Sequence, residues 1–220
     1  MFHFIVKKIK FWLKAANSKG HGTHSPFVYD FIINVLNDER SFYFFNEIEN
    51  IKPQFNNKKI NELLFKMVNY YNLQQIAEVN CSTGITTCYL ASANNNATIF
   101  AFEINKEYAI KFNENINVLE LKNINLFSND INENQQAKYD FVVINNVETI
   151  NELWLNELIL KMQQKSFIVF NKIHCNTVTE SIWNKIKKLP NIITTIDLFD
   201  IGIIVFNNDA FVKQHFDIRY

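Results

Sequence analysis

The chain has 220 residues, 48% of them hydrophobic, and its 22 basic and 22 acidic residues leave a formal net charge of zero. This composition suffices for a full hydrophobic core, and a chain without net charge offers a phosphate backbone no overall attraction, which argues against nucleic acid as the main partner. Cys81, Cys88 and Cys175 form neither a close metal-ligand pair nor an even disulfide framework. We therefore expect buried, reduced thiols and a cytoplasmic protein.

Residues 1–55 predict an N-terminal helical appendage. Within it, the segment SPFVYDFIINVLND offers Ser25 as a helix N-cap, Pro26 at the first helical position and apolar residues at helical spacing. His21 and His24 have a spacing that metal ligands use, but the glycines beside them indicate a tight bend. We expect a structural arm at this place and no metal site.

The first residues, MFHFIVKKIKFWLKAA, are apolar but are interrupted by four lysines. The segment is therefore too broken for the core of a signal peptide or for a membrane span. The stretch FIVKKIKFWLK could lie on a membrane surface with its lysines near phosphates. We expect it instead to pack on its own domain or on a second subunit, which leaves the oligomeric state open between a monomer and a homodimer.

Helix and strand patterns alternate from Asn56 onward, which predicts an α/β domain over residues 56–220. The expected strands carry nearly continuous apolar runs, as parallel strands do when helices cover both faces of the sheet. They are residues 74–80, 97–104, 123–130, 139–145 and 166–173. The expected helices between them are residues 61–71, 86–93, 106–121, 150–164 and 179–189.

The last part of this domain breaks the alternation. Residues 192–208 contain two strand patterns with no room for a crossover helix, and Gly202 lies near their junction, so we expect an antiparallel hairpin. The whole pattern predicts a doubly wound, mostly parallel seven-stranded sheet that ends in an antiparallel hairpin. This is the variant of the Rossmann fold found in methyltransferases.

Polar residues follow the first three expected strands, where an open α/β sheet binds its ligands. The first loop has the spacing E-x-N-x-x-x-G from Glu78 to Gly84, with Asn80 where a glycine would allow the closest approach of a ligand. Asparagine is the residue that best tolerates the left-handed backbone needed there. Glu103 ends the second strand, where a carboxylate can accept both hydroxyls of a ribose, and Asn129 and Asp130 end the third. Together these strand ends predict a nucleoside pocket.

Several segments resemble the class I S-adenosylmethionine-dependent methyltransferases, in particular the bacterial O-methyltransferase-like proteins. They are HGTHSPFVYDFI, the loop from Glu78 to Ala91 with YLASAN, Phe102–Glu103, Ile173–His174, TIDLFDIG and the tail from Lys213 to Arg219. The terminal segments are the specific part of this resemblance, because a loop of the type E-x-G-x-x-x-G occurs often by chance.

The resemblance implies S-adenosylmethionine as cofactor. Glu78 would then help to anchor the methionine amino group, and the backbone from Asn80 to Gly84, which includes Cys81 and Thr83, would pass under the methionine. Glu103 would hold the ribose hydroxyls. Asn129 and Asp130 would border the adenine.

The sequence departs from the metal-dependent members of that family. Those members place an Asp after the fourth strand and an Asp pair after the fifth, because a divalent metal needs hard anionic oxygens. Here Asn145 stands at the first position, and Asn171 and Lys172 stand at the pair. A set of two neutral groups and one cation should not hold magnesium, so we expect no metal.

Two explanations compete for this departure. The site has eroded after activity was lost, or the Lys172 ammonium replaces part of the metal's charge and His174 acts as a general base. In the first explanation Lys172 is a solvated loop residue and His174 packs by a hydrogen bond to backbone.

These residues leave three functional hypotheses. The first is a methyltransferase that acts without metal on a small acceptor, with oxygen as the expected nucleophile and with Lys172, His174 and Asn145 at the acceptor. The second is a non-catalytic protein of the same fold that serves as a binding or assembly module. The third is a nicotinamide-dinucleotide protein, which is disfavoured because no G-x-G-x-x-G follows the first strand.

Overall fold

The computed structural model describes residues 2–15, 25–51, 58–133, 136–206 and 212–220. It divides the chain into two compact units, one formed by residues 1–37 and 143–220 and the other by residues 38–142. The boundary predicted between residues 55 and 56 differs from this division and falls outside the described residues, as does the segment with His21 and His24.

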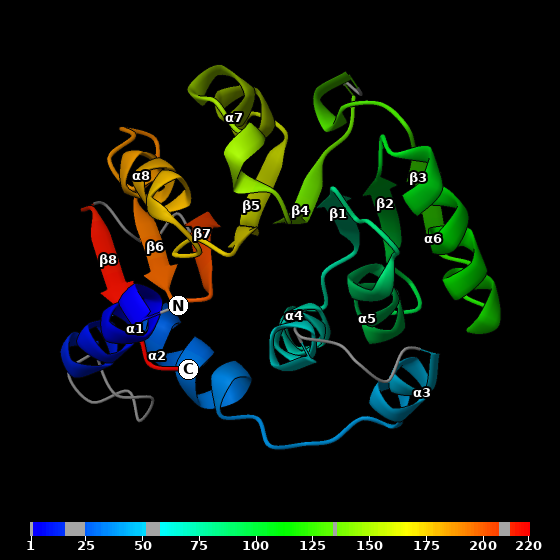
Figure 1. The fold of residues 1–220 in the computed structure, drawn as a ribbon, viewed down its shortest axis with the longest axis horizontal. Coiled ribbons are helices and arrows are strands. Elements are labelled where there is room, and N and C mark those ends of the chain that lie inside the picture. Colours follow the sequence, from blue (N-terminus) through cyan, green and yellow to red (C-terminus); the bar gives the residue numbers. More distant parts are fainter. Residues whose placement is uncertain (1, 16–24, 52–57, 134–135, 207–211) are drawn as a thin grey trace. The chain divides into compact units, whose positions relative to one another are not determined.

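The unit of residues 38–142 contains a sheet with the strand order β3-β2-β1-β4, drawn mainly in green in Figure 1. Strands β1 and β2 pair in parallel from Gln75↔Thr98 to Val79↔Phe102, and β2 pairs in parallel with β3. Its strands are β1 (Gln75–Val79), β2 (Thr98–Phe102), β3 (Ile124–Phe127) and β4 (Tyr139–Ile144), whose last residues belong to the other unit. Its helices are α3 (Tyr43–Ile51), α4 (Lys58–Tyr71), α5 (Ile85–Ala93), α6 (Lys106–Val118) and the 3₁₀ turn η2 (Ile131–Glu133).

Helices α4 and α5 supply much of the core of this unit. The face of α4 with Leu63, Leu64 and Met67 is fully buried, as its helical spacing predicts. Helix α5 is buried almost all round, which fits its short, mostly small side chains. Helix α6 begins at Asn105, whose side chain accepts hydrogen bonds from the backbone N–H groups of Glu107 and Tyr108.

The unit of residues 1–37 and 143–220 contains strands in the order β5-β7-β6-β8. Strand β7 runs antiparallel to both β5 and β6, and β8 pairs in parallel with β6; the opposed arrows of β6 and β7 are visible in Figure 1. The strands are β5 (Met162–Asn171), β6 (Thr194–Asp197), β7 (Ile201–Phe206) and β8 (Gln214–Asp217). The helices are α1 (Phe2–Lys14), α2 (Pro26–Phe31), the π-helix η1 (Ile32–Leu36), the 3₁₀ turn η3 (Val147–Thr149), α7 (Glu152–Ile159) and α8 (Thr177–Ile186).

The fold class predicted from the sequence is confirmed, including the hairpin of β6 and β7. The predicted N-cap is confirmed as well, because the Ser25 side chain accepts a hydrogen bond from the Val28 N–H. The predicted helix over residues 150–164 is wrong at its end, since α7 stops at Ile159 and Met162–Gln164 open strand β5. The Lys161 N–H donates to the Leu158 carbonyl in the intervening turn.

Within the described residues, no helix is both long and apolar enough to cross a membrane.

Candidate functional site

The loop after β1 has an alternating left-handed backbone. Asn80, Ser82 and Gly84 have φ angles of 57°, 52° and 79°. The left-handed conformation predicted for Asn80 is therefore confirmed, and Ser82 adopts it as well. The loop is closed by a hydrogen bond from the Gly84 N–H to the Cys81 carbonyl, 3.0 Å long, and Asn115 Nδ2 donates to the Thr83 carbonyl at 2.7 Å. The first contact closes the loop on itself, and the second ties the loop to α6.

Glu103 joins this loop to the start of α6. Its Oε2 accepts a hydrogen bond from the Ser82 N–H at 2.7 Å, and its Oε1 accepts one from the Asn105 N–H at 2.8 Å. The side chain lies just after the carboxyl end of β2 and is 6% exposed. Each carboxylate oxygen can accept two hydrogen bonds, so one acceptor position on each oxygen remains after these two contacts. Among the predicted cofactor residues, Glu103 therefore has the geometry best suited to a diol.

Glu78 lies in the interior of the unit. Its side chain is fully buried, and its Oε2 accepts a hydrogen bond from the Thr87 hydroxyl of α5 at 2.5 Å. The structure thus places this carboxylate beneath α5, where it ties strand to helix. The predicted contact of Glu78 with a methionine amino group stays a prediction.

The two cysteines of this region are also interior groups. Cys81 and Cys88 are buried. Burial and the nearby Glu78 carboxylate raise the pKa of the Cys81 thiol and raise the pKa of Cys88 to about 12. Cys175, in the other unit, is exposed.

We expect an aromatic disulfide reagent at neutral pH to label one thiol per native chain, that of Cys175. Because thiolate is the reacting form, the buried Cys81 and Cys88 should react only when denaturant unfolds the chain. The colour released at both conditions measures this difference, and Cys175→Ser is the control that should remove the native reaction. Rapid labelling of Cys81 in native protein would contradict the buried loop.

Gly84 is fixed by packing as well as by its backbone. A Cβ atom at this position would lie 2.5 Å from Cδ2 and 2.9 Å from Cε2 of the Phe112 ring on α6. Non-bonded carbon atoms do not approach each other this closely in proteins. The glycine predicted from its place in a cofactor loop is thus required by the fold itself, whether or not a ligand binds.

Asn129 and Asp130 form a local cap after β3. Asn129 Nδ2 donates to Glu133 Oε2 at 3.2 Å, and Asp130 Oδ1 accepts from the Asn132 N–H at 2.8 Å. The Glu133 N–H donates in turn to the Asp130 carbonyl at 3.0 Å. These contacts shape the turn η2, and both predicted residues remain partly exposed.

The predicted metal positions of the other unit lie together. Asn171 Nδ2 donates a hydrogen bond to Asn145 Oδ1, 3.1 Å away. Lys172 follows with an exposed side chain and a left-handed φ of 58°, and its N–H donates to the Asp200 carbonyl at 2.7 Å. Within the described residues, no three His, Cys, Asp or Glu side chains are arranged to hold a metal ion. A paired amide and an ammonium are a poor ligand set for magnesium.

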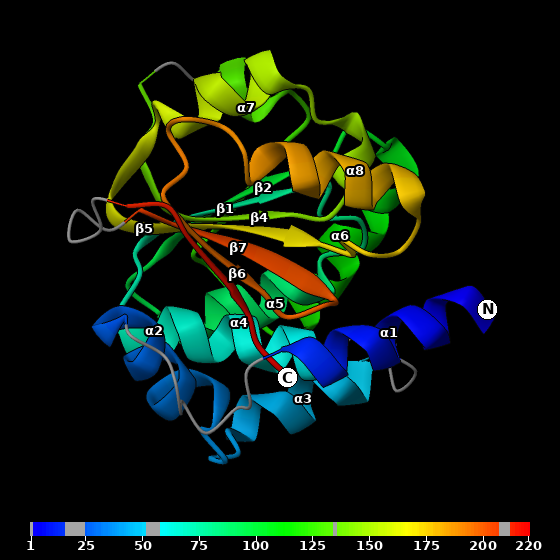
Figure 2. The same cartoon turned by 90° about the vertical axis from the view of Figure 1, so that its left-hand side faces the viewer.

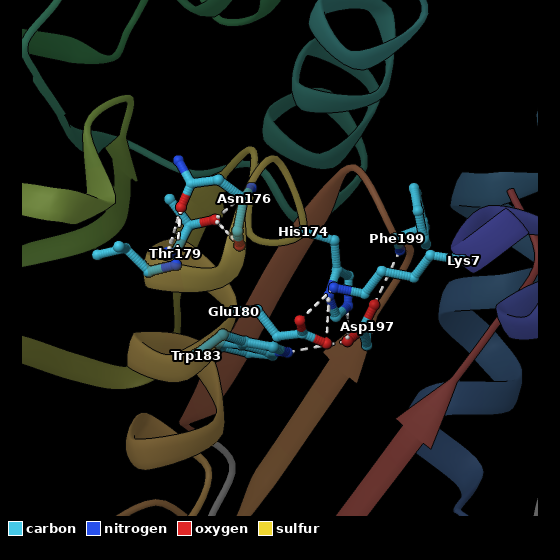
Figure 3. Close-up of polar contacts among 9 residues, drawn as sticks. Lys7, His174, Asn176, Thr179, Glu180, Trp183, Asp197 and Phe199 are labelled. Atoms are coloured by element: carbon cyan, nitrogen blue, oxygen red, sulfur yellow. Dashed lines mark hydrogen bonds and ion pairs between the residues drawn. The ribbon is translucent and has the colours of Figure 1, made fainter. Parts of the chain in front are cut away.

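His174 belongs to a partly buried polar cluster with Asp197, which is buried, and Glu180, whose side chain is 31% exposed (Figure 3). Its Nε2 lies 2.8 Å from Asp197 Oδ2 and its Nδ1 lies 3.6 Å from Glu180 Oε1, while its side chain is 10% exposed. Its ring stacks on Phe199 with centroids 5.2 Å apart, and Phe11 of α1 lies 6.1 Å away. The structure thus gives His174 a carboxylate partner, where the packing alternative predicted a backbone one.

Asp197 collects three donors in this cluster. Besides His174, the Trp183 indole Nε1 donates to Oδ2 at 2.9 Å, and the Phe199 N–H donates to Oδ1 at 2.9 Å. Glu180 also forms an ion pair with Lys7 of α1. Sequence reasoning did not identify Asp197, although it lies in the segment TIDLFDIG that carries the resemblance. The available signal was an acidic residue at the end of an expected strand, and this signal did not indicate that His174 is the partner of Asp197.

Comparison with known proteins finds no matching family model and no matching curated protein. Solved structures with similar folds exist at low sequence identity. A candidate caffeoyl-CoA O-methyltransferase from Staphylococcus aureus aligns with a TM-score of 0.64 and 11% identity, covering 80% of this chain and 98% of that one. A Podospora anserina methyltransferase bound to S-adenosylhomocysteine aligns with a TM-score of 0.64 and 10% identity, covering 83% of this chain and 96% of that one. An O-methyltransferase from Streptomyces achromogenes in complex with S-adenosylmethionine aligns with a TM-score of 0.60 and 10% identity, covering 82% of this chain and 95% of that one. The chain therefore has the fold of the S-adenosylmethionine-dependent O-methyltransferases.

Proposed function

We propose that the chain binds S-adenosylmethionine through the unit of residues 38–142 and transfers its methyl group to a small oxygen acceptor without metal. The observation that carries the proposal is the Glu103 carboxylate. Two backbone N–H groups fix it at 2.7 and 2.8 Å after β2, and one acceptor position on each oxygen remains. A vicinal diol, such as that of a ribose, matches two fixed oxygen acceptors.

Other parts of the same unit fit a nucleoside ligand less specifically. The start of α5 presents backbone N–H groups that have no acceptor within their own helix. The partly exposed Asn80 and Thr83 lie in the loop that leads to it. Two of the similar structures contain S-adenosylmethionine or S-adenosylhomocysteine, which supports the same ligand for this fold.

Calorimetric titration with S-adenosylhomocysteine, S-adenosylmethionine and NAD tests the proposal. We expect heat from the first two ligands and none from NAD. Glu103→Ala should weaken S-adenosylhomocysteine binding by about 1.5–3 kcal/mol, which is the usual value of hydrogen bonds to a charged group. Glu107→Ala is the matched control, because it removes the same charge from an exposed position in the first turn of α6. No heat from any of the three ligands, or equal affinity of the Glu103 and Glu107 variants, would refute the proposed site.

The proposal assigns the acceptor chemistry to Lys172, with the Asn145 and Asn171 amides beside it. An exposed ammonium can orient an acidic or phenolic acceptor. It can also stabilise the negative charge that the acceptor oxygen carries once its proton has left. The ligand set does not fit magnesium, so no step is assigned to a metal. His174 is a weaker candidate for a general base, because its Nε2 is already bound to Asp197.

A second function is favoured by the contact between His174 and Asp197 and by the hydrogen bond between Asn171 and Asn145. Both bonds use polar groups that catalysis would need, which suits a non-catalytic protein that keeps the ligand as a binding or assembly module. A methyl-transfer assay with catechols, phenols and small carboxylates separates the two functions. Transfer that persists with a chelator supports the enzyme. Absence of transfer despite cofactor binding supports the module, and magnesium-stimulated transfer contradicts both.

A further inference from the structure

Helix α1 has two apolar faces, and the described residues of its unit cover only one of them. On the covered face, the Phe11 ring packs against Phe199 with centroids 5.3 Å apart. On the uncovered face, four side chains form what we call the outer stripe of α1: Ile5, Ile9, Trp12 and Leu13, which are 50%, 55%, 45% and 76% exposed. Their spacing of four, three and one residues places them on one side of the helix.

The charged side chains of α1 itself are all positive. Helix α1 contains four lysines and no acidic residue. Lys7 and Lys8 form ion pairs with Glu180 and Asp200 and so fasten the helix to its unit. Lys10 and Lys14 are exposed and form no ion pair within the described residues, which leaves both ammonium groups available to an anionic partner.

A groove of about 410 Å³ lies at the outer stripe of α1. Ile9, Trp12 and Leu13 form its apolar wall. Its cationic lining residues are Arg219 and Lys8, and the Lys8 ammonium is already paired with Asp200. Figures 1 and 2 both draw the C-terminal end of the chain beside α1, in agreement with this lining. The Arg219 Nε is buried and has no hydrogen-bond partner in the described part of the chain. An apolar wall with cations at its rim suits an amphiphile with an anionic head.

We infer that α1 docks the protein on a membrane surface that contains anionic phospholipids. The outer stripe enters the boundary between headgroups and acyl chains, Trp12 lies at the level of the headgroups, and Lys10, Lys14 and Arg219 face the lipid phosphates. The covered face stays on the protein, because Phe11 and the two ion pairs point the other way. The helix therefore lies in the plane of the surface and does not cross the bilayer.

A second copy of the chain fits the stripe less well. In a two-fold symmetric contact the same residues meet from both sides, so the lysines of one α1 would approach those of the other. A stable interface also uses about 20–30 residues on each side, and the stripe offers four large side chains. Anionic lipid, in contrast, complements the lysines and needs only a narrow apolar strip.

Vesicle co-sedimentation tests this inference with the full chain. We expect the protein to sediment with vesicles that contain equal parts of phosphatidylglycerol and phosphatidylcholine and to stay in solution with pure phosphatidylcholine. Ile9→Glu with Leu13→Glu should reduce the binding at least about tenfold, since two charges enter the apolar layer. Lys10→Gln with Lys14→Gln should reduce it by about fivefold for each lysine.

Matched controls come from other exposed positions. Leu153→Glu with Leu160→Glu changes two leucines that are 77% and 75% exposed, and Lys106→Gln with Lys111→Gln removes the same charge from exposed positions of α6. Both controls should bind vesicles like the unchanged chain, and circular dichroism checks that every variant is folded. Light scattering in the absence of lipid measures the molar mass and so shows whether two copies of the chain associate.

Three outcomes would overturn the inference. The first is that folded protein does not sediment with the anionic vesicles. The second is equal sedimentation with both vesicle types, which would show that charge has no part. The third is a dimer in solution that Ile9→Glu with Leu13→Glu dissociates, which would assign the stripe to a second copy.

Discussion

Replacing Asp197 by alanine is expected to lower the free energy of unfolding by about 3–5 kcal/mol, as the removal of one partner from a buried charged cluster usually does. The carboxylate accepts hydrogen bonds from Trp183 and Phe199 and faces His174, and its own side chain is only 4% exposed. Without it, three polar groups would lose their partner in a place that water does not reach easily. Urea unfolding followed by circular dichroism measures the loss.

Asp200→Ala is the control for that change. Asp200 is also an acid of the segment between β6 and β7, but its ion pair with Lys8 is about two-fifths exposed on both side chains. Exposed pairs contribute about 0–1 kcal/mol, so this variant should unfold close to the unchanged chain. A loss at Asp197 as small as that at Asp200 would mean that the buried cluster does not stabilise the unit, and His174 would again be open to a catalytic interpretation.

The order and kind of the elements could largely be predicted from the sequence, because parallel strands covered on both faces and amphipathic helices leave clear patterns. The end of α7 could not, since Met162–Gln164 continue a helical pattern on the page and become strand only beside the rest of β5. Strand β8 was not predicted. Its residues alternate between partly exposed and exposed, and the strand is defined mainly by its backbone pairing with β6.

The candidate site shows the same limit at the level of single residues. The left-handed backbone of Asn80 could be predicted, since asparagine tolerates that conformation unusually well. That of Ser82 could not, because serine has no such preference and its N–H is held by Glu103, which comes from the next strand. The partner of His174 was missed for a similar reason. The pairing with Asp197 joins residues that are far apart in sequence, and only the arrangement of strands brings them together.

Gly84→Ala is expected to lower the free energy of unfolding by about 2–4 kcal/mol in the absence of any ligand. Alanine at a φ of 79° is strained, and overpacking in a well-packed core adds about 1–3 kcal/mol. The added Cβ would meet the Phe112 ring at 2.5 Å, so either the ring or the loop must move. Phe112→Leu in the same chain should recover part of the loss, and the coupling of the two changes, expected at about 0.5–3 kcal/mol, measures the clash directly.

Ser82→Gly is the matched control in the same loop. Its φ of 52° is strained for serine and natural for glycine, so this change should leave stability within about 1 kcal/mol or raise it, while the backbone N–H still donates to Glu103. The comparison decides what the glycine of this loop is for. If Gly84→Ala destabilises the ligand-free chain and Ser82→Gly does not, Gly84 serves the packing of α6 on the loop. If Gly84→Ala leaves stability unchanged but abolishes S-adenosylhomocysteine binding, the glycine makes room for the ligand, and the Phe112 ring moves aside for the added Cβ at little cost.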